Sequence, residues 1–456
     1  MITLPPQAQE IIKTLNKAGF AAYTVGGSVR DLLMNRPTKG WDFTTDATPK
    51  EIIKIFPNSF YDNEFGTVGV KIENELGEVV DVYEITTFRS ETEYKDYRHP
   101  DRVVWGTNLK EDLSRRDLTI SAIAADLENI IDPYGGQNDI KNKLIRTVGT
   151  PDHRFAEDAL RLIRAIRIAT ELGFMIEEKT FASIRINAHL ITKISADRIR
   201  HELIEILKSN HPADGILLLK NSGLLTYILP ELEKAFAIPQ KSPKRHHIYD
   251  VGTHLIESLR NCPSKDPLVK FATLLHDIGK PAVFRKNPNT NMITFYNHEV
   301  VGMGMTKNIL RRLNYSKKAT DKIVTLVRWH QFSVDEMQTD TALRRFIRRV
   351  GKENLKDMLG LRIGDRLGGG AQETSWRLRL FTKRLEEVQK QPFTVADLKV
   401  NGHDVMQLFG IGPGPMVGKV LDELFNEVIT DKIKNDRTKL RARLKKLFTV
   451  YYKTTS

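Results

Sequence analysis

The sequence predicts an α+β protein, in which a small mixed-sheet head over residues 1–145 is followed by an all-helical remainder. Two observations predict this class. Short apolar runs with period-two alternation, separated by turns, occur within the first 145 residues. From about residue 150 onward, apolar side chains recur three or four residues apart, as Phe155, Ala159, Leu162, Ile163 and Ile166 do. This spacing is typical of one face of a helix.

The elements of the head can be predicted in order along the chain. The pattern predicts a helix over residues 6–18, a strand over 21–25, a Gly26-Gly27 turn with a short helix from Ser28, and strands over 41–45, 67–72 and 79–87. A turn over residues 74–78 makes the last two strands a hairpin.

Length and composition set the number of domains and the class of partner. The 456 residues suggest about three or more domains. Four segments are predicted: the head, a helical neck and body over 146–240, a helical domain over 241–370 and a basic helical tail over 371–456. The formal net charge is +13, and nine Lys and Arg residues fall within 431–456. Such a basic tail is either a solvated helix face or a surface for a polyanion such as RNA.

Cysteine content and hydropathy indicate the compartment. Cys262 is the single cysteine, which excludes an intrachain disulfide and cysteine-based zinc sites. No uncharged apolar run of about 18 residues occurs, and the first residues contain no apolar signal core. We therefore expect a protein of the reducing cytoplasm, neither exported nor embedded in a membrane.

Several residues of the head suit a nucleotide site. The two glycines before Ser28 allow close approach of an anion to the backbone, with Arg30 nearby. Asp42 lies in a strand. Glu84 shares one strand face with Val80, Val82 and Thr86, so an unpaired carboxylate on this apolar face would be costly. Glu84 is either the partner of an arginine such as Arg89 or a magnesium ligand opposite Asp42.

A second group of polar residues recurs every three positions on the helix predicted around residues 154–167. Asp158, Arg161, Arg164 and Arg167 all lie opposite the apolar stripe. A surface helix with i,i+3 ion pairs is one interpretation. One acid and three arginines on a single face is also an excess of positive charge that suits an anionic ligand.

At this point the sequence resembles a known family. The segments GGSVRD (26–31), YEITTFR (83–89), EDLSRRDLTISA (111–122) and RFAEDALRLIRAIR (154–167), with Asp42 in its strand, resemble the class II tRNA nucleotidyltransferase and poly(A) polymerase family. The resemblance covers about residues 20–205 and continues weakly in the tail. It implies a nucleotidyltransferase head, a helical neck and body, and Mg²⁺-dependent transfer of nucleotides from CTP and ATP to a tRNA 3′ end.

The resemblance also implies a role for each matched residue. The backbone near Gly27 and Ser28, with Arg30, holds the triphosphate; Asp42 and Glu84 are the catalytic carboxylates that bind Mg²⁺; Arg115, Arg116 and Asp117 contact phosphate and ribose; Asp158 and Arg161 select the base; Arg164 and Arg167 support them or the phosphates. Residues 91–101 resemble a loop that family members use when switching from CTP to ATP, which favours addition of the terminal A.

The sequence departs from the family pattern at Gly40. Family members pair two metal-binding carboxylates two residues apart on one strand, and Gly40 stands where the partner of Asp42 is expected. Asp46 is a poor substitute, because four strand residues span roughly 13 Å. A milder departure is Ser121 in place of the usual Asn. We therefore expect this chain to bind tRNA and nucleotides but to add nucleotides slowly.

The helical middle of the chain carries a second candidate metal site. His254, His276, Asp277, His298, His330 and Asp365 resemble the HD-domain pattern. Neutral imidazoles with carboxylates are typical ligands of Mn²⁺, Fe²⁺, Zn²⁺ or Ni²⁺.

Together these features predict a tRNA nucleotidyltransferase that contains an HD domain and adds C, C and A. Two alternatives stay open: an A-adding or poly(A)-adding enzyme of the same family, and a phosphohydrolase that works at the HD site with a non-catalytic, nucleotide- or RNA-binding head.

Overall fold

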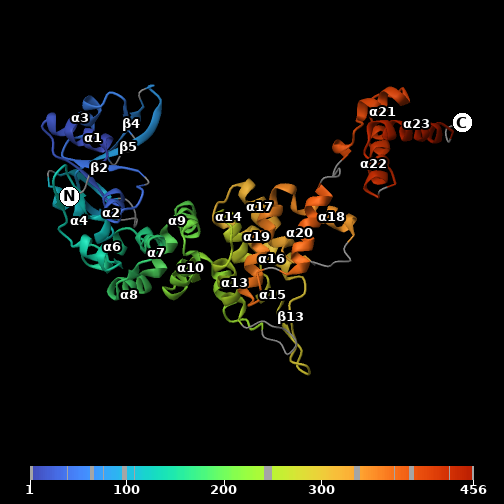
Figure 1. The fold of residues 1–456 in the computed structure, drawn as a ribbon. Helices are drawn as coiled ribbons and strands as arrows, with labels where there is room; N and C mark the ends of the chain where they lie inside the picture. Colours follow the sequence, from blue (N-terminus) through green and yellow to red (C-terminus); the bar gives the residue numbers. More distant parts are fainter. Residues whose placement is uncertain are drawn as a thin grey trace.

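The computed structural model describes residues 4–38, 40–61, 66–74, 76–94, 100–106, 108–240, 249–332, 339–373, 375–389, 395–430 and 432–453. The protein is elongated: a head with a mixed sheet lies at one end, a helical region follows, and the three C-terminal helices lie at the other end (Figure 1). This arrangement confirms the predicted fold class. Within the described ranges, no helix is long and apolar enough to cross a membrane.

A seven-stranded mixed sheet forms the centre of the head. Its strand order is β3 (Ser59–Tyr61), β4 (Thr67–Glu73), β5 (Val79–Thr87), β2 (Asp42–Thr45), β1 (Ala22–Val25), β8 (Ala124–Ala125) and β9 (Ile130–Ile131). Strands β2 and β5 pair in parallel, and the other neighbouring pairs are antiparallel. The hairpin predicted from residues 67–87 is β4–β5, and it is confirmed.

Short helices and a second hairpin complete the head. They are α1 (Pro6–Lys17), α2 (Gly27–Leu33), α3 (Pro49–Ile55), α4 (Leu109–Ser114), α5 (Gly136–Lys141), the 3₁₀ helix η1 (Thr119–Ser121) and the hairpin of β6 (Arg89–Tyr94) with β7 (Pro100–Trp105). Apolar residues of α1 and α3 share one core with Phe43 of β2 and Ile85 of β5. Because side chains alternate along a strand, Asp42 and Glu84 face away from this core.

The neck consists of short helices and a two-stranded parallel sheet. Its elements are β10 (Leu144–Ile145), α6 (Pro151–Glu157), α7 (Leu160–Leu172), β11 (Met175–Ile176), α8 (Glu178–Asn187), η2 (Ala188–Lys193), α9 (Ala196–Lys208), α10 (Pro212–Asn221), α11 (Leu224–Ile228) and α12 (Pro230–Ala235). The predicted apolar stripe is confirmed, since Phe155, Ala159, Leu162, Ile163 and Ile166 are all fully buried.

The single helix predicted through residues 154–167 is wrong. The chain is extended at Asp158, with φ −137° and ψ 106°, so α6 ends before it and α7 begins after it. The Asp158 carboxylate accepts a hydrogen bond from the amide of Leu160, the first residue of α7, at 2.9 Å. Asp158 therefore lies at the junction of two helices and does not share a continuous helix face with Arg161.

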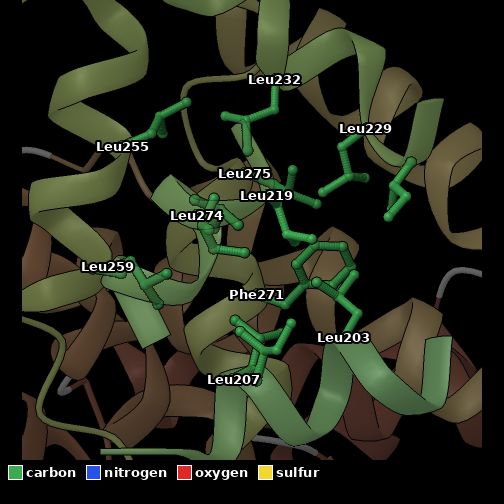
Figure 2. Packing of buried hydrophobic residues seen from close by; sticks show 14 of the residues in the cluster. Leu203, Leu207, Leu219, Leu229, Leu232, Leu255, Leu259, Phe271, Leu274 and Leu275 are labelled. Carbon is green, nitrogen blue, oxygen red and sulfur yellow. The ribbon is translucent and has the colours of Figure 1, made fainter. Parts of the chain in front are cut away.

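The next helices pack against the neck without a break in the hydrophobic core. They are α13 (Val251–Arg260), α14 (Pro267–Leu275), α15 (Lys280–Val283), α16 (His298–Arg312), α17 (Lys317–Trp329), α18 (Asp340–Val350), η3 (Lys352–Asn354), α19 (Leu355–Gly368) and α20 (Trp376–Gln389), with the short hairpin of β12 (Arg285–Lys286) and β13 (Ile293–Thr294). One cluster of buried residues extends from Leu118 to Val388. Figure 2 shows its centre, where Leu203 and Leu207 of α9 meet Phe271 of α14.

The C-terminal helices have a separate core. They are the 3₁₀ helix η4 (Val395–Asp397), α21 (Gly402–Phe409), α22 (Pro415–Ile429) and α23 (Arg437–Lys453). Leu440, Leu444 and Leu447 of α23 are buried against apolar residues of α21 and α22. The basic segment is thus an amphipathic helix, and its exposed positions include Lys445 and Lys446.

Candidate active site and a buried histidine cluster

A polar cleft of about 590 Å³ lies between the head and the neck. The head contributes Gly26, Gly27, Ser28, Arg30, Asp31, Arg36, Pro37, Gly40, Asp42, Arg116, Asp117 and Ser121, and the neck contributes Arg164, Arg167, Ile168, Glu171, Leu172, Glu205, Lys208, Ser209 and Asn210. The structure therefore brings together most residues that the sequence predicted for the nucleotide site. Four predicted residues do not line this cleft: Glu84, Arg115, Asp158 and Arg161.

Asp42 and Glu84 lie side by side, as predicted. They are Cα partners in the parallel pairing of β2 with β5, so both side chains leave the same face of the sheet. Burial in the cleft raises the pKa of the Asp42 carboxyl, and the Arg116 guanidinium acts in the opposite direction. Two adjacent carboxylates offer the oxygen ligands that Mg²⁺ prefers.

The prediction that Glu84 lies on a buried apolar face is wrong. The face it shares with Val80 and Val82 is exposed, with Val80 60% and Val82 39% accessible, while Tyr83 and Ile85 on the other face are buried. The Glu84 side chain is itself exposed. Burial therefore imposes no penalty on this carboxylate, and its importance depends on its pairing with Asp42.

Gly40 lines the cleft close to this pair. A Cβ at Gly40 would meet no heavy atom within 4 Å, and its φ is outside the left-handed region. A side chain would therefore fit at this position. Asp46 is engaged elsewhere, since its Oδ1 accepts a hydrogen bond from the amide of Ala21 at 2.8 Å. The glycine at position 40 thus leaves open space near Asp42, where family members carry a second carboxylate.

The glycine turn before α2 brings the backbone close to the Asp42 carboxylate. Gly26 has φ +80°, and a Cβ there would lie 3.0 Å from Arg116 Nη1 and 3.6 Å from Asp42 Oδ2. Only a residue without a side chain allows this approach at low cost. Ser28 is turned inward, and its Oγ donates to the Val25 carbonyl oxygen at 3.0 Å. Arg30 pairs with Asp31 at 2.8 Å.

Asp112 holds Arg115 and Arg116 in place. A role for it was not predicted from the sequence. Its fully buried carboxylate lies 2.9 Å from Arg115 Nη2 and 3.7 Å from Arg116 Nη2, and it accepts from Thr44 Oγ1 at 3.3 Å. Burial alone would raise the pKa of Asp112, but the two guanidinium groups hold it below its usual value. The spacing i,i+3 and i,i+4 to the two arginines was the available signal.

The predicted base-selecting pair makes contacts within the protein. Arg161 is buried, and its guanidinium donates to Glu157 Oε2 at 2.6 Å and to the Arg115 carbonyl oxygen at 3.1 Å. Asp158 Oδ2 lies 3.4 Å from Arg198 Nη2. Arg161 therefore connects the start of α7 to the segment that carries Arg115.

The remaining predicted residues of the neck are also paired. Arg164 Nη1 lies 3.4 Å from Asp117 Oδ2, which joins α7 to the head. Burial tends to raise the pKa of Asp117, and nearby arginines, Arg164 first, keep it lowered. Arg167 lies between Glu202 Oε2 at 2.6 Å and Glu171 Oε1 at 3.0 Å. Because Glu202 is on α9, Arg167 fastens α7 to α9.

The six predicted residues of the HD pattern meet in one buried cluster. They come from α13 (His254), the turn after α14 (His276 and Asp277), α16 (His298), the end of α17 (His330) and α19 (Asp365). On one side of the cluster, His254 Nε2 lies 3.2 Å from His276 Nε2 and 3.3 Å from Asp365 Oδ1. On the other side, Asp277 Oδ1 lies 3.0 Å from His298 Nε2 and 3.5 Å from His330 Nε2.

Backbone carbonyls fix the orientation of three imidazoles. The Nδ1 atoms of His276, His298 and His330 lie 2.7–2.8 Å from the carbonyl oxygens three residues earlier, of Thr273, Phe295 and Val327. An Nδ1–H that donates to a carbonyl leaves the Nε2 lone pair toward the cluster, as in metal-binding histidines. Each of these side chains is at most 5% accessible.

The two carboxylates of the cluster are strongly acidic. Burial alone would raise the pKa of Asp277, but Lys280 and His276 hold it well below its usual value. In the absence of a bound metal, burial tends to lower the pKa of His276, and Asp277 and Asp365 outweigh this and raise it to about 10. Lys280 Nζ lies 2.5 Å from Asp277 Oδ2 and donates to Gln240 Oε1 at 2.5 Å. The contact of Lys280 with Asp277 was not predicted from the sequence.

Three families match successive parts of the chain. The matches are the Poly A polymerase head domain over residues 22–146, the Probable RNA and SrmB-binding site of polymerase A over 173–236, and the tRNA nucleotidyltransferase domain 2 putative over 298–444. Residues 237–297, between the second and third matches, include His254, His276 and Asp277.

Whole-chain similarity agrees with these matches. The chain is 31% identical over 444 residues to the CCA-adding enzyme of Ligilactobacillus salivarius, which covers 97% of this chain and 96% of the relative. A crystal structure of the Bacillus stearothermophilus CCA-adding enzyme in complex with CTP is similar with a TM-score of 0.70 and 28% identity, over 99% of this chain and 100% of that one. The Thermotoga maritima CCA-adding enzyme complexed with tRNA shares the fold, with a TM-score of 0.61 and 19% identity over 97% and 95%. This chain belongs to the family of CCA-adding enzymes, within the nucleotidyltransferases that share the poly(A) polymerase head.

Proposed function

We propose that this chain adds C, C and A in turn to the 3′ ends of tRNAs that lack them, using CTP and ATP and releasing pyrophosphate. The observation that carries the proposal is the cleft, where Asp42 with its strand partner Glu84 lies next to the turn over residues 26–28 and opposite the arginines of α7. The full-length similarity to CCA-adding enzymes, one of them in complex with CTP, supports this choice of substrate.

Asp42 and Glu84 fit the role of Mg²⁺ ligands, because both are carboxylates and both project from the same face of the sheet. When bound there, Mg²⁺ would align the α-phosphate with the primer hydroxyl and neutralise developing negative charge. Gly40 supplies no third carboxylate. We therefore propose that the chain binds its substrates but transfers nucleotides slowly.

The other predicted residues, some in the cleft and some beside it, each contact a different part of the substrate. Gly27, Ser28 and Arg30 hold the triphosphate; Arg115, Arg116 and Asp117 contact phosphate and ribose; Asp158 and Arg161 select the base; Arg164 and Arg167 support the selecting pair or the phosphates. A carboxylate accepts from the exocyclic amine of cytosine or adenine, and a guanidinium donates two parallel hydrogen bonds. Arg161 would exchange its contact with Glu157 for one with the base.

We propose that the buried histidine cluster binds a divalent transition metal such as Mn²⁺, Fe²⁺, Zn²⁺ or Ni²⁺. The donor set of imidazole nitrogens and carboxylates from His254, His276, Asp277, His298, His330 and Asp365 is typical of these ions. A second candidate function is phosphoester hydrolysis at this cluster. The Lys280 ammonium, 2.5 Å from Asp277, favours it because a cation beside the ligands could hold a phosphate.

The test is an extension assay with purified protein, Mg²⁺ and tRNA that lacks its 3′ end. CTP alone should extend the RNA by two nucleotides, and CTP with ATP by three, with product lengths resolved on a gel. Asp42→Asn should abolish extension, since an amide is a weaker Mg²⁺ ligand than a carboxylate. Extension by ATP alone would instead identify an A-adding or poly(A)-adding enzyme.

A matched assay with a phosphomonoester and a 2′,3′-cyclic phosphate tests the second candidate. Hydrolysis that Asp277→Asn removes and Asp42→Asn leaves intact would support it. Absence of hydrolysis with every metal ion supplied would reject hydrolysis but not metal binding.

A further inference from the structure

The cleft extends well beyond the residues that the reaction itself requires. Its lining also includes Arg36 and Pro37 of the head, and Lys208, Ser209 and Asn210 at the end of α9. None of these residues has a role in the nucleotide site described above.

A fixed turn holds Arg36 at the edge of the cleft. Asn35 adopts the left-handed conformation with φ +54°, which asparagine tolerates better than most residues. The Arg36 amide then donates to the Asp31 carbonyl oxygen at 2.8 Å, which closes the turn after α2. Pro37 follows and restricts the backbone further. The backbone of Arg36 is therefore well positioned, while its side chain is exposed.

Arg36 differs from the other basic residues that line the cleft. Each of the others has a carboxylate partner: Arg30 with Asp31 at 2.8 Å, Arg116 with Asp112 at 3.7 Å, Arg164 with Asp117 at 3.4 Å, Arg167 with Glu171 at 3.0 Å and Lys208 with Glu205 at 2.6 Å. Among the described residues, Arg36 has no such partner. It therefore presents a free guanidinium to an anion that enters the cleft.

The position of Arg36 separates it from the triphosphate. Gly27 and Ser28 start α2, and Arg36 follows the end of this seven-residue helix, which is roughly 10 Å long. The reacting groups lie at the first end, where the Gly26 backbone approaches Asp42. A nucleoside triphosphate held there leaves the second end of the cleft for the other substrate, the RNA.

We propose that Arg36 binds a backbone phosphate of the RNA 3′ strand and that Lys208, on the opposite wall, completes this subsite. The proposal rests on the function proposed above. Guanidinium and ammonium groups bind phosphates without reading the bases. This suits a site that must hold 3′ ends of different sequence as the strand grows. Lys208 is 52% accessible and keeps donors beyond its contact with Glu205.

Binding experiments test this without depending on nucleotide addition. The affinity of a fluorescently labelled tRNA that lacks its 3′ end would be measured by anisotropy over a range of salt concentrations. Arg36→Gln should weaken binding by roughly threefold to tenfold and reduce the slope of log affinity against log salt by about 0.7. Arg36→Lys should retain most of the affinity, and Lys50→Gln, an exposed lysine of α3, should leave binding unchanged.

The affinity for CTP, measured by calorimetry, distinguishes the two substrates. Unchanged CTP affinity in Arg36→Gln and in Lys208→Gln is expected. Weaker CTP binding with unchanged RNA binding would overturn the proposal and assign Arg36 to the triphosphate. If Arg36→Gln alters neither affinity, the RNA strand does not touch this turn. A wild-type chain that binds no tRNA would contradict the proposed function itself, whatever Arg36 does.

Discussion

Asp42 and Glu84 face the same side of the sheet from neighbouring parallel strands, while Gly40, two residues before Asp42, leaves open space in the same cleft. Two carboxylates alone leave a two-metal arrangement incomplete. We predict that the chain adds nucleotides slowly and that Gly40→Asp raises the rate about a hundredfold or more, since misplacement of reacting groups by about 1 Å costs on that order. Single-turnover extension of tRNA measures this.

Gly40→Asn is the control, because it has nearly the same size as Gly40→Asp but no charge. Affinity for tRNA should stay the same in both variants. If the unaltered chain already adds CCA rapidly and Gly40→Asp changes nothing, another residue supplies the third ligand.

The second prediction concerns Arg161. Arg161→Ala should lose efficiency and selectivity with CTP and ATP more than it loses tRNA affinity, because a lost bidentate contact is worth roughly 1–3 kcal/mol. Since Arg161 also bonds to Glu157, the melting temperature must be measured in parallel. Incorporation of UTP and GTP is the decisive readout. Unchanged rejection of these nucleotides by a folded variant would contradict the proposed base selection.

The third prediction concerns the basic tail. Replacing Lys445 and Lys446, both exposed on α23, with Gln should weaken tRNA binding and reduce the salt slope by about 1.4–1.8. The matched control replaces Lys13 and Lys17, exposed on α1 of the head. An unaltered salt slope in the tail variant would show that this part of α23 is only a solvated face.

The fourth prediction concerns the histidine cluster. The protein should co-purify with a transition metal, and His276→Ala with Asp277→Ala should remove it, as elemental analysis would show. Because the proposed ligands come from separate segments of the chain, chelation should also lower the melting temperature. Free metal at a hundredfold its Kd contributes roughly 3 kcal/mol. Nucleotide addition at a low temperature should survive.

A milder pair of variants separates metal binding from damage to the core. His330→Gln removes one buried histidine of the cluster, and His403→Gln changes an exposed histidine of α21. The first should reduce metal content and the second should not. A wild-type protein free of metal would defeat the proposal.

Local patterns in the sequence predicted the features that depend on local geometry. The period of two placed Glu84 and Tyr83 on opposite faces of β5, and helical spacing identified the buried residues of α6 and α7. Sequence spacing alone does not show which face of a strand is covered. Glu84 was therefore expected on a buried face, although α1 and α3 cover the other one.

Two further differences between prediction and structure concern Asp158 and Asp112. Asp158 is extended between α6 and α7 and interrupts a pattern that reads as one helix, and its carboxylate accepts a hydrogen bond from the Leu160 amide at the start of α7. Asp112 looked like one acid among several in an acidic and basic segment. Its importance depends on burial under Arg115 and Arg116, which only the tertiary structure specifies.

The C-terminal helices α21–α23 pack around a hydrophobic cluster distinct from the one that runs from Leu118 to Val388. Two separate cores melt as separate cooperative units when few contacts join them. We therefore expect calorimetry to resolve a distinct transition for the tail. If the smaller tail core melts first, the head would still bind nucleotides between the two transitions, while the tRNA contacts proposed for the tail would be lost. On heating, the chain would then lose tRNA binding before the catalytic head unfolds.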